Sequence, residues 1–522
     1  MLYPPVVRRV VPGTAIVLFI IVSLAYRSSF GLNNTLVSPS ATSTACEIWP
    51  DQQWSSPEKL RYEDCYGAAK SPQVGDVGIL GSPRHCLLAG SRLDQYHSTE
   101  YNWTEVRWGQ VQTRCATHKS RLPLTGDDSH QIWLQRTELQ QEETLKGDGN
   151  WIAVVLRTWD NYEYTEKRLA WLRALIVEAA LHRDEKYRVY FLVNVKDPNI
   201  DLEDEATYKQ SLLNVVPKEF HDIALLFNER TLKMWYPQIP EHGAQDQMYQ
   251  ALQIFSHKFP QYDYIWQLEM DLRFTGHVHD TLQSATSFAR TQRRRNLWER
   301  NGRFYVPHLY NNSYDAFSNA VDAEIGDTGV WGPMSTTDFA PEGPPPPSRL
   351  KWNWGVGEEA DLISFMPMID PIGTDWIYED GIHGFTDGTA TPRRAAIVSI
   401  TRSSRRLLQL ISKAQQRGQW LVSEATLETF ALLHGLKAVT VPQLIYFADE
   451  VENLDAEINK GPPHSKAGGE APSMLYMKNG WLNGPWWKAS YWFTAGVAAE
   501  LWEAYVGGQS LPPMLLHPVK EK

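Results

Sequence analysis

Strand-like and helix-like segments alternate regularly from Trp151 onward, and this order limits the possible folds more than any other feature. Residues 152–156 form a short apolar run rich in β-branched side chains, as expected of a buried strand. Asp160 and Glu163 predict a capping box ahead of a helix, and the apolar residues 187–195 predict a second strand. Strand, helix and strand in this order predict a βαβ unit in an α/β fold with a mostly parallel sheet.

The alternation recurs further along the chain and ends in two acidic side chains. A helix is expected over residues 245–258 and a strand over residues 262–268, directly before Glu269 and Asp271. Ligands of open α/β sheets bind beyond the carboxyl ends of the strands. The side chains of two acids spaced two residues apart in an extended segment project from the same face of the strand. We therefore expect both carboxylates to hold one Mn²⁺ or Mg²⁺ ion. The alternative is a solvated strand end without a ligand.

A second group of candidate residues ends at Asp361, where paired tryptophans and two glycines precede three carboxylates. The faces of Trp352 and Trp354 are suited to stacking on a sugar ring. A carboxylate beside them can take the proton from an attacking hydroxyl, so Glu358, Glu359 and Asp361 are candidate catalytic residues. The alternative is that these acids only favour the positive N-terminus of a following helix.

Two histidines are candidates for a third metal ligand. His383 lies among acids and glycines, and its neutral imidazole is a suitable donor. His277 follows Asp271 closely in the sequence and is the competing candidate.

The segment Glu269-Met270-Asp271 resembles the Asp-x-Asp motif of GT-A glycosyltransferases, with Glu in the first place as in some fungal Golgi mannosyltransferases. The resemblance implies a GT-A-like fold, in which helices flank a mixed, mostly parallel sheet, and glycosyl transfer from a nucleoside diphosphate sugar. The metal ion would neutralise the charge that builds up on the departing diphosphate. Both inversion and retention at the sugar stay open. The residues expected to bind the nucleotide sugar are Arg157, Thr158, Trp352 and Trp354.

The tryptophan-rich segment is similar to the Trp-Gly-Trp-Gly-Gly-Glu-Asp segment of β-1,4-galactosyltransferases, in which the second acid is the base. This resemblance implies that Glu359 is the base and His383 the third metal ligand. In the present chain Asn353 replaces a glycine and Val356 separates the two glycines. These departures leave the choice between Glu358 and Glu359 open.

Residues 151–447 also resemble an ascomycete family that is catalogued only as a domain of unknown function. Its members share similar Glu-Met-Asp and Trp-Gly-x-Gly-Glu-Glu-Ala-Asp segments. Some of these relatives carry transporter labels. Such labels do not fit this chain, because only residues 10–26 are apolar enough to meet a bilayer.

Residues 10–26 predict one membrane anchor, preceded by Arg8 and Arg9. Their length is at the short end of the spanning range of about 17–25 residues. The arginines keep the N-terminus cytoplasmic under the positive-inside rule. We therefore expect a single-pass type II protein of the Golgi or ER membrane with a lumenal catalytic domain. The alternative is a cleaved signal peptide, with small residues at Ser23 and Ala25, and a secreted protein.

Cysteines and sequons agree with a lumenal location. The four cysteines are Cys46, Cys65, Cys86 and Cys115. An even number of cysteines after an N-terminal segment that directs the chain to the secretory pathway predicts two disulfides. The sequence leaves their pairing open. A zinc site is disfavoured because no two cysteines are closely spaced. Glycosylation sequons begin at Asn33, Asn102 and Asn311.

Composition and the resemblance to GT-A glycosyltransferases together predict four parts of the chain. They are a cytoplasmic tail and signal anchor (1–27), a lumenal stem and disulfide-bearing region (28–148), a GT-A-like catalytic domain (149–450), and a loop with a tryptophan-rich extension (451–522). The net charge of -11 argues against a nucleic-acid partner, because phosphate binding needs a basic surface. The expected partners are a nucleotide sugar, an acceptor that is a glycan, lipid or small molecule, and the membrane through one N-terminal helix. Two other functions stay open: a glycoside hydrolase with paired carboxylates, and a lumenal carbohydrate-binding protein without catalysis.

Overall fold

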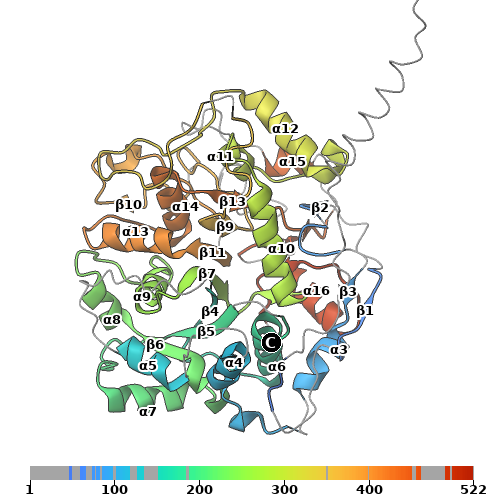
Figure 1. The fold of residues 1–522 in the computed structure, drawn as a ribbon, viewed down its shortest axis with the longest axis vertical. Helices are drawn as coiled ribbons and strands as arrows, with labels where there is room; N and C mark the ends of the chain where they lie inside the picture. Colours follow the sequence, from blue (N-terminus) through green and yellow to red (C-terminus); the bar gives the residue numbers. More distant parts are fainter. Residues whose placement is uncertain are drawn as a thin grey trace, which may run out of the picture. The chain divides into compact units, whose positions relative to one another are not determined.

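A seven-stranded sheet lies at the centre of the protein, which we describe from a computed structural model (Figure 1). In spatial order its strands are β13 (Ala438–Thr440), β9 (Leu362–Ser364), β11 (Ile400–Ser404), β7 (Tyr262–Glu269), β4 (Trp151–Trp159), β5 (Tyr187–Asn194) and β6 (Ala224–Phe227). Strand β11 runs antiparallel to both of its neighbours, and every other pair in this sheet is parallel. The prediction of a mixed, mostly parallel α/β sheet is confirmed.

The structure describes most of the chain after Ala45. The described residues are 46–49, 59–65, 73–76, 78–82, 85–97, 101–117, 126–134, 151–183, 187–348, 351–374, 376–397, 399–449, 454–459, 488–493 and 497–520. They belong to one compact unit, Ala45–Lys522. The predicted anchor at residues 10–26 and the sequon at Asn33 lie outside them. Among the described residues, no helix has the length and apolar character needed to cross a membrane.

Helices cover both faces of the sheet. On one side α9 (Gln250–Lys258), α13 (Arg405–Gln415) and α14 (Ser423–His434) pack together, and on the other α6 (Glu166–Ala180) packs with α10 (Val278–Thr291) (Figure 1). The remaining α-helices are α3 (Ala89–Leu93), α4 (Trp108–Thr117), α5 (Gly126–Leu134), α7 (Glu205–Val215), α8 (Glu229–Trp235), α11 (Leu297–Asn301), α12 (Tyr314–Ile325), α15 (Leu454–Ile458) and α16 (Val497–Val506).

The helix after β4 begins later than the sequence predicts. Thr165, rather than Asp160, caps α6, and its hydroxyl accepts a hydrogen bond from the backbone N–H of Arg168. The Asp160 carboxylate instead accepts from the backbone N–H of Lys196 at 2.9 Å and so joins the loops after β4 and β5. The predicted helix at residues 245–258 is likewise shorter, because residues 244–249 form turns before α9.

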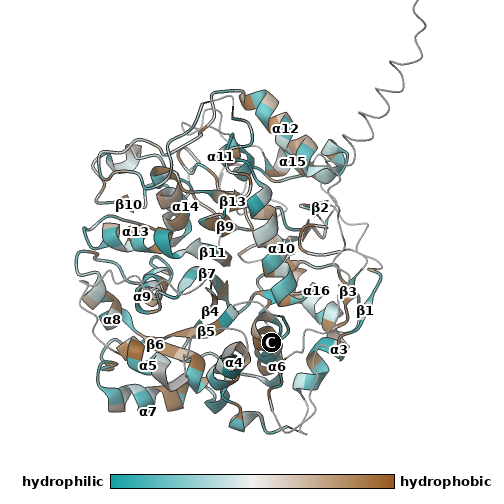
Figure 2. Ribbon diagram, viewed as in Figure 1, coloured by the Kyte–Doolittle hydropathy of each residue, from teal (hydrophilic) through white to brown (hydrophobic). Residues whose placement is uncertain are grey.

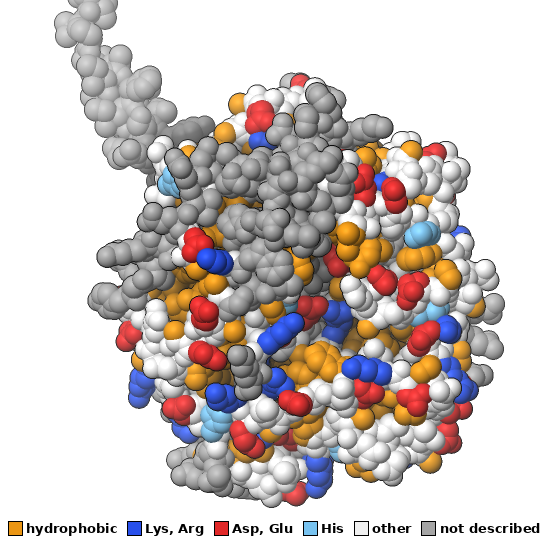
Figure 3. Space-filling view, turned by 180° about the vertical axis from the view of Figure 1, so that it is seen from behind, with side chains coloured by type: hydrophobic (Ala, Val, Ile, Leu, Met, Phe, Trp, Pro, Cys, Tyr) orange, Lys and Arg blue, Asp and Glu red, His pale blue; other side chains and the backbone are white. Residues whose placement is uncertain are grey.

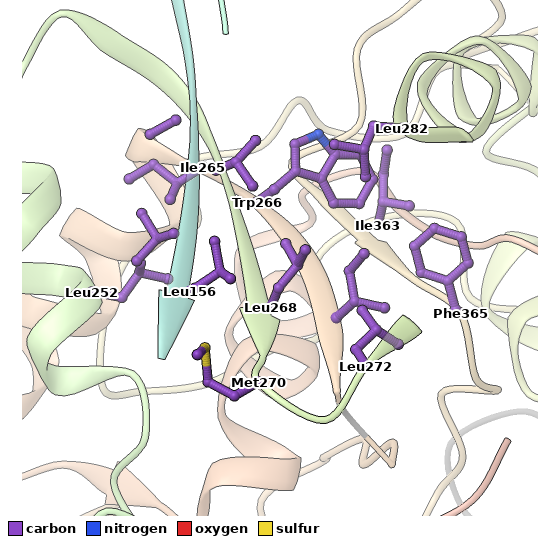
Figure 4. Close-up of a cluster of buried hydrophobic side chains, with 14 of the residues drawn as sticks. Leu156, Leu252, Ile265, Trp266, Leu268, Met270, Leu272, Leu282, Ile363 and Phe365 are labelled. Atoms are coloured by element: carbon purple, nitrogen blue, oxygen red, sulfur yellow. The ribbon is translucent and has the colours of Figure 1, made fainter. Parts of the chain in front are cut away.

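Apolar side chains of the central strands form the core that positions the acidic segment. Leu156, Leu268 and Ile363 from β4, β7 and β9 pack together, and Met270 extends the same cluster at the end of β7 (Figure 4). Figure 2 shows that apolar residues lie on the central elements, whereas polar residues lie on the outer side of helices such as α13. Because Met270 is only 3% exposed, its burial holds the backbone between the two acids in place.

The disulfide-bearing region packs against the sheet domain. The two disulfides predicted from the sequence are Cys46–Cys115 and Cys65–Cys86. Strand β1 (Tyr62–Glu63) pairs with β3 (Cys86–Leu87), and β2 (Gln73–Val74) pairs with β14 (Ile445–Tyr446). Asn102 and Asn311 of the two described sequons are exposed. Basic and acidic side chains are interspersed over the face seen in Figure 3.

The C-terminal segment is also part of the domain. Strand β15 (Leu515–Leu516) pairs antiparallel with β8 (Arg273–Phe274), which follows the acidic segment directly. The Val519 N–H donates to the Asp271 carbonyl at 2.8 Å. The described parts of the disulfide-bearing region and of the C-terminal extension thus lie in the same compact unit as the predicted catalytic domain.

Candidate metal centre and adjoining cavity

Three side chains that could hold a metal ion, which we call the metal group, meet at the carboxyl end of β7. Glu269 is the last residue of β7, Asp271 lies in the turn that follows, and His517 comes directly after β15. Each offers one ligand atom, and these atoms lie within 4.8 Å of one another. Carboxylate oxygens suit Mn²⁺ and Mg²⁺, and the imidazole nitrogen makes this donor set fit Mn²⁺ better than Mg²⁺.

Backbone contacts direct the imidazole of His517 toward the acids. Its Nδ1–H donates to the backbone carbonyl of Trp492 at 2.5 Å. Its Nε2 then lies 3.0 Å from Glu269 Oε2 and 3.2 Å from Asp271 Oδ1. A carbonyl partner on the far nitrogen fixes the orientation of a ligating histidine, as in many metal sites.

The charges in this group favour a protonated imidazole when no cation is bound. Burial lowers the pKa of His517, but hydrogen bonds and charge from Asp271 and Glu269 outweigh burial and raise it to about 10. Burial raises the pKa of Asp271, and the contact with His517 outweighs it and lowers that pKa. Arg157 adds an ion pair to Glu269. A divalent cation would replace the proton of His517 as the positive charge of the group.

A cavity of about 700 Å³ opens beside this group, at the carboxyl ends of four parallel strands. Residues of β4, β5, β6 and β7 that line it include Arg157, Thr158, Trp159, Asn194, Phe227 and Glu269. The Nε of Arg157 is buried and donates no hydrogen bond within the described residues. Arg157 and Thr158, two of the residues expected to bind the nucleotide sugar, thus line this cavity.

The acids of the tryptophan-rich segment do not reach this cavity. Asp361 directly precedes β9, and its carbonyl accepts from the N–H of Ser404 at 2.7 Å. Ser404 in turn pairs with Tyr264, near the start of β7. At about 3.3 Å per residue, Glu269 lies roughly 16 Å further along that strand. The segment that holds Glu358, Glu359 and Asp361 is therefore at the opposite edge of the sheet from the metal group.

Each of these three acids is held by an arginine. The closest N–O distances are 2.5 Å for Arg294–Glu358, 2.9 Å for Arg402–Glu359 and 2.7 Å for Arg406–Asp361. The three carboxylates are therefore ion-pair partners of arginines, and none of them lines the cavity. The structure thus separates the base implied by the resemblance from the metal it would serve.

The two tryptophans lie outside the cavity as well. The guanidinium of Arg295 covers the Trp352 ring, and that of Arg294 lies over the Trp354 ring at 5.2 Å. Trp352 lines a separate cleft between α10 and α12, together with Asn319 and Asn353. These rings do not meet the predicted metal ligands, because the loop that carries them folds onto the arginines after α10.

Neither predicted histidine joins the acids. His383 forms β10 (Ile382–His383), and its ring stacks on Trp420 of the paired strand β12 (Trp420–Leu421), with ring centres 4.0 Å apart. His277 precedes α10 and lies 3.0 Å from His182. The third donor, His517, had no local motif in the sequence to mark it, because only the pairing of β15 with β8 brings it to the acids.

Comparison with known proteins agrees with the family suggested by the sequence. No curated protein matches the chain. The family described as "Protein of unknown function (DUF3405)" matches residues 59–521, a span that includes the acidic segment, the cavity and His517. The chain belongs to this family of proteins of unknown function, DUF3405.

Proposed function

We propose that the protein is a metal-dependent glycosyltransferase that uses a nucleoside diphosphate sugar. The observation that carries the proposal is the placement of Glu269, Asp271 and His517 beside Arg157, in one cavity at the carboxyl ends of parallel strands. The mixed sheet supports a GT-A-like fold, because such a fold flanks a mostly parallel sheet with helices.

The chemistry of the cavity is suited to a diphosphate leaving group. A divalent cation supplies a Lewis acid that neutralises the charge on the departing phosphate. The guanidinium of Arg157 and the ammonium of Lys196, which both line the cavity, add positive charge for the phosphates. A volume of about 700 Å³ lies within the ordinary range of about 300–1,000 Å³ for small-molecule sites.

A glycoside hydrolase is the second candidate, because more than one carboxylate lines the cavity. That reaction requires one carboxyl group that stays protonated to act as the acid. Glu269 is instead ion-paired with Arg157, and the contact with His517 lowers the pKa of Asp271, so that Asp271 is not suited to be this acid. The metal-dependent transfer is therefore the better account of these two acids.

The test is a screen of the purified protein against nucleotide sugars with Mn²⁺, measured as release of nucleoside diphosphate. We expect release with at least one donor, loss of release with a chelator, and recovery on adding Mn²⁺. Asp271→Asn should weaken Mn²⁺ and donor binding together in isothermal titration, because it removes one anionic ligand. Glycan cleavage that a chelator leaves unchanged would point to the hydrolase instead. Glycan binding without donor turnover would point to the carbohydrate-binding alternative.

The same proposal places the enzyme in the Golgi or ER membrane through residues 10–26. Two disulfides and the exposed Asn102 and Asn311 support a lumenal location. Alkaline carbonate extraction tests the anchor, and release of the full-length chain into the soluble fraction would favour the secreted alternative.

A further inference from the structure

One carboxylate of the cavity lies on a helix that is otherwise enclosed. Every residue of α14 is buried except Glu424, near its start. The side chain of Glu424 lines the same cavity as Glu269 and Asp271. Glu424 is therefore the residue of α14 that is both partly exposed and part of the cavity lining.

Backbone contacts hold Glu424 in position. The Glu424 carbonyl accepts from the N–H of Ala396 at 2.9 Å, and the hydroxyl of the preceding Ser423 accepts from the N–H of Met248 at 2.9 Å. Ile397, next to Ala396, and Met248 line the cavity themselves. The carboxylate therefore projects from a rigid element that is tied to two other walls of the site.

Glu424 differs from the other cavity acids in its partners. Glu269 pairs with Arg157, Asp271 with His517, and Glu229 with Lys233. Glu424 forms no ion pair within the described part of the chain. Of these cavity acids, it is the one whose negative charge no cation holds in place.

The surroundings of Glu424 also favour proton uptake. Burial is the largest cause, and the charges of Asp246 and Glu269 add to it, so that the pKa of Glu424 is raised to about 7. The titratable and charged groups that interact electrostatically with Glu424 are Arg157, Asp246, Tyr249, Glu269, Tyr378 and Glu428. A base whose pKa lies near the working pH is both ionised and able to accept a proton.

We propose that Glu424 is the catalytic base, which takes the proton from the attacking hydroxyl of the acceptor. This inference rests on the proposed glycosyl transfer and selects inversion for it. The hydroxyl oxygen forms its bond to the anomeric carbon while its proton passes to the Glu424 carboxylate. The bond between the anomeric carbon and the diphosphate oxygen breaks, and its electron pair leaves with the diphosphate on the side of Glu269 and Asp271. The proton on Glu424 then returns to solvent through the cavity.

The test is Glu424→Gln, which keeps the size of the side chain and removes its basicity. We expect kcat to fall by about 10²–10⁴, the usual contribution of a general base. Mn²⁺ and donor affinities in isothermal titration should stay close to wild type, because the metal group is unchanged. In the wild type, kcat/KM should rise with pH until Glu424 is ionised, near pH 7, and this rise should be absent in Glu424→Gln.

Two further variants separate a base from a structural residue. Glu424→Asp should retain part of the rate, because it keeps a carboxylate. Glu424→Ala should be restored in part by added formate, which can take the place of the missing base. Near-wild-type turnover of Glu424→Gln would overturn the assignment, as would a folded Glu424→Ala variant that formate leaves inactive. Absence of donor turnover in the wild type would instead contradict the proposed function itself.

Discussion

His517 must lose a proton before it can bind a metal, because Asp271 and Glu269 raise its pKa to about 10. In the metal-free protein the imidazolium stabilises the fold fully below its ordinary pKa of about 6.5. This contribution is lost as pH rises through about 10. Metal binding and protonation therefore compete at the same nitrogen.

We predict that each Mn²⁺ bound at pH 7.5 releases about one proton, and that affinity rises with pH up to the pKa of His517. Titration calorimetry in buffers of different ionisation enthalpy measures both quantities. His517→Asn should weaken Mn²⁺ binding and abolish the release. His383→Asn is the matched control, because His383 stacks on Trp420 away from the acids. Equal losses of Mn²⁺ affinity in the His517→Asn and His383→Asn variants would contradict the assigned ligand set.

At the scale of elements, the short pairing of β15 with β8 determines whether the metal group exists. Leu515 pairs with Phe274 and Leu516 with Arg273, so the register of this pair places His517 beside the turn that holds Asp271. Leu515 and Leu516 are fully buried. Apolar burial, rather than the metal, thus holds the C-terminal segment in place.

We predict that Leu515→Ala lowers the free energy of unfolding by about 2–5 kcal/mol, the usual cost of emptying a buried leucine site. It should also weaken Mn²⁺ binding, since His517 follows the same strand. Urea unfolding and Mn²⁺ titration check the two effects. Leu213→Ala is the control, because Leu213 is 62% exposed and its loss should change stability by less than about 0.5 kcal/mol. Normal metal affinity in a destabilised Leu515→Ala would show that β15 does not position the histidine.

At the scale of the whole molecule, the disulfide-bearing region and the sheet domain are joined by a buried ion pair. Arg92 of α3 and Glu178 of α6 are fully buried, with N–O distances of 2.6 and 2.8 Å. Glu178 also accepts from the N–H of Val278 at the start of α10. The pair therefore links three elements on one side of the sheet.

We predict that Glu178→Gln lowers the free energy of unfolding by about 3–5 kcal/mol, because Arg92 stays buried without its counter-charge. Glu205→Gln is the control, since its pair with Lys209 is exposed and is worth about 0.3–0.5 kcal/mol. Urea unfolding followed by tryptophan fluorescence measures both. Equal effects of the two substitutions would mean that the buried pair does not couple the region to the domain.

The sequence by itself determined the features that depend on neighbouring residues. The strands β4, β5 and β7 follow from local apolar runs, and the parallel sheet follows from their alternation with helices. The position of Glu269 and Asp271 follows from the strand that they end, and the cysteine count predicted two disulfides. These features are local, so short-range patterns are enough to predict them.

Only the tertiary structure decided which distant side chains share the site. The resemblance implied that Glu359 and His383 lie beside the metal. The register of β9, β11 and β7 instead keeps Glu359 at the far edge of the sheet. His517 and Glu424 reach the cavity from β15 and α14, through strand pairing and helix packing between residues far apart in the chain. Such contacts arise from the burial of whole surfaces, which no short segment of the sequence specifies.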